Sequence, residues 1–242
     1  MRPFRQELKF LIHYSLREML LERWSRYLMR APFTNEHAVT PVLSQYYDSP
    51  DLLFYHEKVD GLPLRNKVRI RQYSHRFERG ATTFLEIKHR QHDLVKKYRY
   101  AFKDFDPEIH LDPANWEIDD RELESAILTL RERHRLRASA QTYYQREAYQ
   151  GAVEADIRIT FDTVLIGLHP RERLTPMMIH DPSRRLMADT LVILEVKATK
   201  GIPPWVHEGV VAAELRQKTI PKYISAVEAL GLLEISAGGI YA

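Results

Sequence analysis

The 242-residue sequence contains no cysteine, which excludes disulfide bonds and thiolate metal sites and fits a reducing compartment. It has no apolar run near the roughly 20 residues that a membrane-spanning helix needs. Its first residues show no apolar signal-peptide core. No Gly/Ser-rich linker or low-complexity segment divides the chain. These absences predict a cytoplasmic protein that folds as a single domain over residues 1–242.

Common nucleotide and hydrolase motifs are also missing. The sequence has neither GxxxxGK[ST] nor GxGxxG, so a glycine-rich turn that holds nucleotide phosphates is not supported. There is no HExxH motif, and no nucleophile elbow frames a serine. The predicted chemistry therefore has to come from a different arrangement of side chains.

Alternation of charged and apolar residues is the strongest pattern that the sequence does contain. Along a strand, successive side chains point to opposite faces. In the segment Thr83 to Arg90, Leu85 and Ile87 fall on one face, and Glu86, Lys88 and Arg90 fall on the other. The same alternation recurs in Glu7–Phe10, Lys67–Arg71, Asp156–Asp162 and Leu194–Lys197.

The periodicities predict about eight strands, with helices between and after them. The strands are expected at Phe4–Ile12, Pro41–Asp48, Leu64–Tyr73, Thr82–Arg90, Leu94–Phe102, Ala140–Tyr149, Glu154–Leu165 and Thr190–Thr199. The helices are expected at His13–Arg30, Asp51–Lys58 (with Ser49 as its cap), Arg121–Leu136, Pro203–Arg216 and Lys222–Leu230. Short connections favour antiparallel neighbours, so the fold class is α+β.

Cations dominate the charged strand faces. They are Lys9, Lys67, Arg69, Arg71, Lys88, Arg90, Lys97, Arg99, Arg146, Arg158 and Lys197. The amphipathic helices need an apolar sheet face to cover, which would turn the charged faces into a closed β-barrel or tunnel with the helices outside. Burying so many cations is prohibitive unless an anionic, hydrated ligand fills the space. A dense polyanion is implied, and phosphate chains suit the planar fork of arginine and the compact charge of lysine.

Three glutamates share these faces with the cations: Glu7, Glu86 and Glu195. Next to phosphate they would be unfavourable unless a hard divalent cation such as Mg²⁺ or Mn²⁺ lay between them. Each could equally be the ion-pair partner of a neighbouring lysine or arginine. The sequence leaves both interpretations open.

Together these residues resemble the vacuolar transporter chaperone (VTC) domain, the polyphosphate polymerase type within the triphosphate tunnel metalloenzymes (CYTH-like superfamily). The resemblance covers nearly the whole chain, and it rests on the order and spacing of several short motifs. They are Glu7–Ile12, Tyr46–Asp48, Tyr55–Gly61, Arg65–Tyr73, Phe84–Lys88, Val95–Arg99, Tyr144–Tyr149, Arg158–Asp162, Leu194–Lys197 and Lys222–Tyr223.

The resemblance implies which residues hold a triphosphate or growing chain in the tunnel: Lys9, Arg69, Arg71, Lys88, Lys97, Arg146, Arg158 and Lys222. It implies Glu195 as the main metal ligand, with Glu7 and Glu86 as further candidates for Mn²⁺ or Mg²⁺. Lys96 competes with Lys97, and alternation with Arg99 favours Lys97. Lys67, Arg90, Arg99 and Lys197 are expected to contact substrate. Where the family tends to have serine before the Lys-Tyr pair, this chain has Pro221.

Three functions remain open. The first is a polyphosphate-forming phosphotransferase of bacterial type that uses ATP, in the cytoplasm or at the inner face of a membrane through a membrane-protein partner. The second is a metal-dependent tripolyphosphatase. The first strand carries Glu7 and Lys9 but lacks the ExExK pattern of the hydrolytic branch, which favours transfer. The third is a non-catalytic polyphosphate-binding module. Nucleic acid is not expected, because a narrow tunnel would exclude a duplex.

Overall fold

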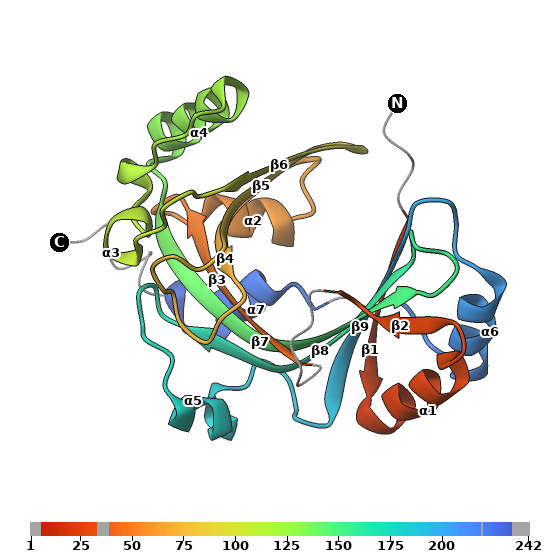
Figure 1. The fold of residues 1–242 in the computed structure, drawn as a ribbon. Coiled ribbons are helices and arrows are strands. Elements are labelled where there is room, and N and C mark those ends of the chain that lie inside the picture. The colour runs from red at the N-terminus through yellow and green to blue at the C-terminus, as the bar shows by residue number, and fades with distance from the viewer. Residues whose placement is uncertain (1–5, 33–38, 219, 234–242) are drawn as a thin grey trace. The chain divides into compact units, whose positions relative to one another are not determined.

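The computed structural model describes residues 6–32, 39–218 and 220–233. Its strands form an antiparallel sheet in the order β1-β9-β8-β7-β3-β4-β5-β6, with β2 paired to β7 (Figure 1). The strand bounds are β1 Gln6–His13, β2 Leu28–Arg30, β3 Thr40–Asp48, β4 Leu64–Gln72, β5 Thr83–Gln91, β6 Leu94–Ala101, β7 Arg137–Gly151, β8 Arg158–Leu168 and β9 Leu191–Ala198.

The helices are short and lie between the strands or after the last one. Their bounds are α1 Tyr14–Trp24, α2 Leu53–Val59, α3 Pro107–His110, α4 Arg121–His134, α5 Pro176–His180, α6 Pro204–Ala212 and α7 Lys222–Ala229. Two single turns of 3-10 helix, at Pro113–Asn115 and Pro182–Arg184, complete the described elements. Within the described ranges, no helix combines the length and the apolar character needed to cross a membrane.

The chain divides into two compact units. Unit 1 comprises residues 1–41, 144–165 and 187–220, and unit 2 comprises residues 42–143, 166–186 and 221–242. Strands β7 and β8 each contribute residues to both units. The prediction of a single domain stays a prediction.

The core of unit 1 lies between helices α1 and α6 and one face of strands β1, β8 and β9. Alternate residues of β9, from Val192 to Ala198, are buried in it, together with Phe10 and Phe161. Trp24 of α1 donates a hydrogen bond from its indole nitrogen to the carbonyl oxygen of Trp205 in α6, at 3.0 Å. The helices thus cover the apolar face, and the charged residues of these strands point the other way.

Unit 2 repeats this arrangement. Val68 and Ile70 of β4 are buried against the apolar stripe of α4, which includes Leu123 and Ile127. Helix α4 starts where predicted, because Asp120 accepts hydrogen bonds from the backbone N–H groups of its first turn. The prediction that helices lie under apolar strand faces is therefore confirmed within each unit.

Closure of the barrel is not confirmed. Among the described residues, β1 pairs with β9 and, through an isolated bridge at Phe10, with Gln217, whereas β6 pairs only with β5. Hydrogen bonds between the described strands therefore do not close the sheet. The fold is α+β and antiparallel, as predicted. The predicted first strand began at Phe4, which lies outside the described residues.

Several local predictions were wrong. The helix predicted at Pro203–Arg216 ends at Ala212. The helix predicted to run from His13 to Arg30 ends at Trp24, and Leu28–Arg30 forms strand β2 beside β7. Helix α2 is capped by Leu52, which has a φ of 56°, instead of Ser49. The hydroxyl of Ser49 nevertheless accepts a hydrogen bond from the backbone N–H of Leu53, at 2.8 Å, so it satisfies a donor of the first turn.

Candidate functional site

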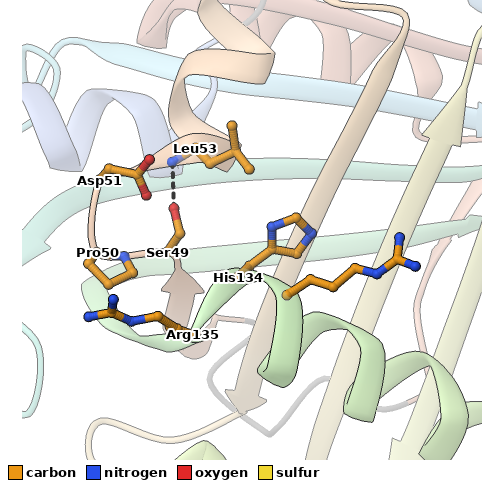
Figure 2. A pocket seen from close by; sticks show the side chains of 7 residues that line it. Ser49, Pro50, Asp51, Leu53, His134 and Arg135 are labelled. Carbon is orange, nitrogen blue, oxygen red and sulfur yellow. Dashed lines mark hydrogen bonds between the residues drawn. The ribbon is translucent and has the colours of Figure 1, made fainter.

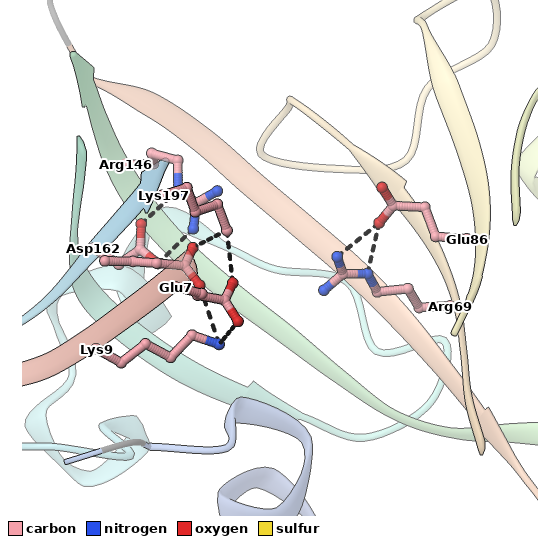
Figure 3. Close-up of polar contacts among 8 residues, drawn as sticks. Glu7, Lys9, Arg69, Glu86, Arg146, Asp162 and Lys197 are labelled. Atoms are coloured by element: carbon pink, nitrogen blue, oxygen red, sulfur yellow. Dashed lines mark hydrogen bonds and ion pairs between the residues drawn. The ribbon is translucent and has the colours of Figure 1, made fainter. Parts of the chain in front are cut away.

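Six charged residues gather on the sheet face of unit 1 that the helices leave uncovered. We call them the mixed-charge cluster: Glu7, Lys9, Arg146, Asp162, Glu195 and Lys197 (Figure 3). The β1–β9 register creates it, because Lys9 lies opposite Glu195 and Glu7 opposite Lys197. Each pair of directly opposite residues therefore has unlike charges, which stabilises this part of the sheet.

Both lysines of the cluster bridge the two glutamates. The ammonium nitrogen of Lys9 lies 3.2 Å from Glu7 Oε2 and 3.1 Å from Glu195 Oε1. That of Lys197 lies 3.2 Å from Glu7 Oε1 and also contacts Glu195 Oε2. The result is a closed network of alternating charges.

Arg146 and Asp162 form the most buried ion pair of the cluster. Arg146 Nε donates to Asp162 Oδ1 at 2.6 Å, and one terminal nitrogen donates to Oδ2 at 2.7 Å. The side chains are 12% and 1% exposed. Burial alone would lower the pKa of Arg146, but the Asp162 carboxylate raises it well above its usual value. Arg158 is exposed on β8, opposite Lys197 in the strand register.

The pKa of Glu195 shows how the network holds its charge. Burial alone would raise this pKa, but Lys197 and Lys9 outweigh burial and keep it well below its usual value. Burial would lower the pKa of Lys9, yet the two glutamates raise it. Glu195 is therefore ionised at any physiological pH, as either a metal ligand or an ion-pair partner must be.

Glu7 and Glu195 supply the oxygen ligands that Mg²⁺ or Mn²⁺ prefers, but few of them. Among the described residues there is no group of three or more Asp, Glu, His or Cys side chains placed to hold a metal ion. Mg²⁺ commonly binds through one or two carboxylates, with water and substrate phosphates completing its shell. The two glutamates fit that type of site. Glu86, the third predicted ligand, belongs to unit 2.

A second charged group lies in unit 2, and its charges are not balanced. We call it the cation group: Lys67, Arg69 and Arg71 of β4 and Lys222 of α7, with the carboxylate Glu86 of β5. Arg69 donates to Glu86 Oε2 from two nitrogens, at 2.8 and 2.7 Å (Figure 3). In the mixed-charge cluster three cations meet three carboxylates, whereas here the carboxylate of Glu86 lies near three arginines, with Arg69 at 2.7 Å, Arg71 at 3.8 Å and Arg99 at 3.7 Å. An external anion would neutralise the excess positive charge of the cation group.

Arg71 is the clearest sign of this imbalance. It is 7% exposed, and its Nε has no hydrogen-bond partner in the described part of the chain. The nearest carboxylate oxygen, on Glu86, is 3.8 Å from this nitrogen, which is too long for a hydrogen bond. A buried charged donor without an acceptor is unfavourable, so an anion that reached it would be stabilised.

The pKa values of neighbouring groups report the same positive potential. Burial lowers the pKa of Lys67 to about 8, and repulsion from Arg69, Arg71 and Lys222 adds to this effect. Tyr46 of β3 is 1% exposed, with its hydroxyl 3.4 Å from Arg69 and its ring 4.9 Å from the Lys67 ammonium. Burial would raise the pKa of Tyr46, yet these cations and Arg71 lower it to about 6.

The other predicted cations of unit 2 lie at different distances from this group. Lys88 is exposed between Lys67 and Lys97 in the strand register. Arg99 lies 3.7 Å from Glu86. Lys96 contacts Glu122 of α4, which places Lys97 on the other face of β6 with Arg99. Arg90 is bound within its own hairpin, because it donates to the carbonyl oxygen of His92 at 2.7 Å.

The titration of Tyr46 leads to a prediction about stability. Its pKa is about 6 in the folded protein and 10.0 for an ordinary tyrosine, so the unfolded chain binds more protons between these values. The stabilisation from Tyr46 is therefore complete above about pH 10 and is lost as the pH falls through about 6. Lys67 acts in the same direction between about 8 and 10.5.

We expect urea midpoints to rise less steeply with pH in Tyr46→Phe than in the wild type, and the tyrosinate absorbance that appears near neutral pH to be absent from the variant. Tyr47→Phe is the matched control, because burial raises the pKa of Tyr47 well above the usual value. Identical pH profiles for the wild type and Tyr46→Phe would contradict this account.

A separate hollow of about 350 Å³ lies in unit 2 between the start of α2 and the end of α4 (Figure 2). It is lined by Ser49, Pro50, Asp51, Leu53, Arg133, His134 and Arg135. None of these is a predicted site residue. Arg137, the first residue of β7, donates to the carbonyl oxygen of Pro50 at 2.7 Å, which connects the two segments.

Sequence reasoning missed Tyr46 and Asp162 as members of these groups. Tyr46 was part of a quoted motif, but an aromatic pair on a strand usually indicates packing. Asp162 lay on a recognised charged face, but its partner Arg146 is on another strand. Only the pairing of strands, which a single sequence does not show, brings either residue to its cations.

Comparisons with known proteins agree with the fold and with the motifs. The sequence matches the VTC domain family over residues 4–231. It is 24% identical over 252 aligned positions to vacuolar transporter chaperone complex subunit 4 of Trypanosoma brucei brucei. That match covers 84% of this chain and 31% of the relative, so the chain spans about a third of the relative's length.

Two solved structures are similar over most of the chain. A putative adenylate cyclase from Bacillus halodurans gives a TM-score of 0.54 at 11% identity, covering 91% of this chain and 95% of that one. The PH1819 protein of Pyrococcus horikoshii gives a TM-score of 0.46 at 17% identity, covering 93% and 98%. The first likeness supports the fold alone. The family match extends through both units and confirms the resemblance drawn from the sequence motifs: the chain belongs to the VTC domain family.

Proposed function

We propose that this protein is a phosphotransferase that moves the terminal phosphoryl group of a nucleoside triphosphate, such as ATP, to a phosphate or polyphosphate end. The observation that carries the proposal is the charge imbalance around Glu86, whose carboxylate is shared by Arg69, Arg71 and Arg99. Lys67 lies nearby, over the ring of Tyr46, whose hydroxyl accepts from Arg69. A dense anion neutralises such a group, and phosphate matches both guanidinium and ammonium donors. Membership of the VTC domain family supports this choice of anion.

Phosphoryl transfer asks for little covalent chemistry from the protein, since positioning and charge neutralisation supply most of the rate. Arg69 and Arg71 would bind and orient phosphate oxygens, and Lys67 and Lys222 would add charge as the leaving group becomes more negative. Lys88, Lys97 and Arg99 would extend the binding surface on β5 and β6. The acceptor is already an anion, so the proposal needs no strong general base.

The family resemblance assigns the mixed-charge cluster to the same reaction. Lys9, Arg146, Arg158 and Lys197 would bind phosphate oxygens there. Glu195, with Glu7, would hold a divalent ion such as Mn²⁺ or Mg²⁺, whose charge would neutralise phosphate oxygens when bound. Glu86 is engaged by Arg69, and we assign it to the ion pair.

We also propose that this chain has a protein partner. The trypanosome relative is named as a subunit of a complex, and we extend to this chain a protein partner, which would be a membrane protein if the product crosses a membrane. That arrangement would place the protein in the cytoplasm, at the inner face of the membrane.

The test is to incubate the purified protein with ATP, Mn²⁺ or Mg²⁺ and a short phosphate primer. Products are separated on a polyphosphate gel, and free phosphate is assayed in parallel. A ladder of long chains together with ADP is the expected result. Free phosphate without a ladder would make the protein a hydrolase. Neither product, with tripolyphosphate still raising the melting temperature, would make it a polyphosphate-binding module.

A further inference from the structure

The last residue of strand β3, Asp48, carries a buried carboxylate. Asp48 is fully buried, and it forms no ion pair among the described residues. Hydrogen-bond donors surround it instead. The backbone N–H groups of Ser49, Phe54 and Tyr55 donate to it at 2.7, 2.8 and 3.0 Å, and the hydroxyl of Tyr223 donates at 2.6 Å. Three of these bonds fix the loop into α2, and the fourth reaches α7.

Tyr223 occupies the first turn of α7 and is held from three sides. Its hydroxyl binds Asp48, and Ser139 Oγ of β7 lies 3.1 Å from the same hydroxyl. Its ring packs on Tyr46 with the centroids 5.0 Å apart. No side chain caps this end of the helix, so its position depends on the side-chain contacts of Tyr223. They fix the point from which the neighbouring Lys222 leaves the backbone.

Lys222 needs such a fixed point. It is the first residue of α7 and adjoins Tyr223, whose ring packs on Tyr46. Tyr46 in turn contacts Arg69 and Lys67. A lysine side chain has many rotamers, and repulsion from like charges disfavours those that lead into the cation group. Fixing the first turn of the helix restricts the rotamers available to Lys222. Less side-chain entropy is therefore lost when an anion binds.

We propose that Asp48 and Tyr223 are positioning residues, whose hydrogen bond fixes the first turn of α7 so that Lys222 stays in the cation group. This inference rests on the proposed function, in which Lys222 binds phosphate. It adds two residues that do not contact the phosphate themselves.

The experiment is a double-mutant cycle with tripolyphosphate as the titrant, measured by isothermal calorimetry. We expect Lys222→Ala to weaken binding about 10-fold, as the loss of one charged contact does. Tyr223→Phe should weaken it about 3- to 10-fold, and the double variant should bind no more weakly than Lys222→Ala alone, because both changes remove one interaction. Tyr55→Phe is the matched control. It removes a hydroxyl that binds Glu228 at the other end of the same helix, and it should leave the affinity unchanged.

Several outcomes would overturn the inference. They are wild-type affinity in Tyr223→Phe, additive losses in the double variant, or an equal loss in Tyr55→Phe, which would indicate helix packing alone. A wild-type protein that does not bind tripolyphosphate would instead overturn the proposed function. A loss in Lys222→Ala without one in Tyr223→Phe would overturn only the inference.

Hydrogen exchange on the wild type provides a test that does not depend on the variants folding. The amide of Ser225, which donates to the carbonyl oxygen of Pro221 at 3.1 Å, should already be protected without tripolyphosphate, and its addition should change this protection little. Protection that appears only with tripolyphosphate would show that the turn is not fixed beforehand, and would overturn the inference.

Discussion

Glu195→Gln is expected to reduce the formation of product from ATP on the order of 100-fold or more while tripolyphosphate still binds. Glutamine keeps the volume of the side chain but removes the charge that would hold a divalent ion, and metal stabilisation of phosphate charge is worth several kcal/mol. Anion binding should survive, because the change removes a negative charge beside Lys9 and Lys197. Product is measured on the polyphosphate gel and binding by calorimetry.

Glu147→Gln is the matched control for this experiment. Glu147 also belongs to unit 1 and is 13% exposed, but its partner is Arg17 of helix α1. It lies outside the mixed-charge cluster, so its loss should leave turnover unchanged. Undiminished turnover in Glu195→Gln would contradict the metal-binding role and leave Glu195 as an ion-pair partner of the lysines.

Asp162→Ala is expected to lower the free energy of unfolding by about 3–5 kcal/mol, the usual cost of leaving one partner of a buried ion pair alone. Arg146 would keep its charge in a site where its side chain is 12% exposed and would lose both hydrogen bonds to Asp162. Urea denaturation measures the loss. Combining Asp162→Ala with Arg146→Met should recover most of it, since no unpaired charge is then buried.

Asp119→Ala is the control for stability. Asp119 pairs with Lys103 on the surface, where the side chains are 59% and 79% exposed. Water screens this pair, so its removal should shift the midpoint far less than Asp162→Ala does. If the two substitutions shifted the midpoint equally, the Arg146–Asp162 pair would not be a main support of unit 1.

Much of the fold could be predicted from the sequence, because strand alternation is a local signal. The segment Thr83–Arg90 falls within β5, with Leu85 and Ile87 buried as the pattern indicates. Strand β2 was missed for the opposite reason. Its three residues follow a helical stripe, and only pairing with β7 makes them a strand. Barrel closure depends on long-range pairing, which the alternation of single strands does not determine.

The candidate site was predictable as a set of charges but not as two groups of different character. The sequence placed cations and glutamates on the same faces and left their pairing open. The register of β1 with β9 makes Glu7 and Glu195 partners of Lys9 and Lys197. The register of β4 with β5 pairs Glu86 with Arg69, and Nε of Arg71 is left without a hydrogen-bond acceptor among the described residues. Asp48 was in a quoted motif, but its link to Tyr223 spans 175 positions of sequence.

The measurement that tests the central claim most directly is calorimetric binding of tripolyphosphate to the wild type, Arg71→Met and Arg79→Met. Arg79 belongs to the same unit and is 72% exposed in a pair with Asp106, so its substitution controls for the loss of one positive charge. We expect binding by the wild type and by Arg79→Met, and an affinity about 10- to 100-fold weaker in Arg71→Met, as for a lost charged hydrogen bond. Equal affinities in all three proteins, or no binding by the wild type, would contradict the central claim.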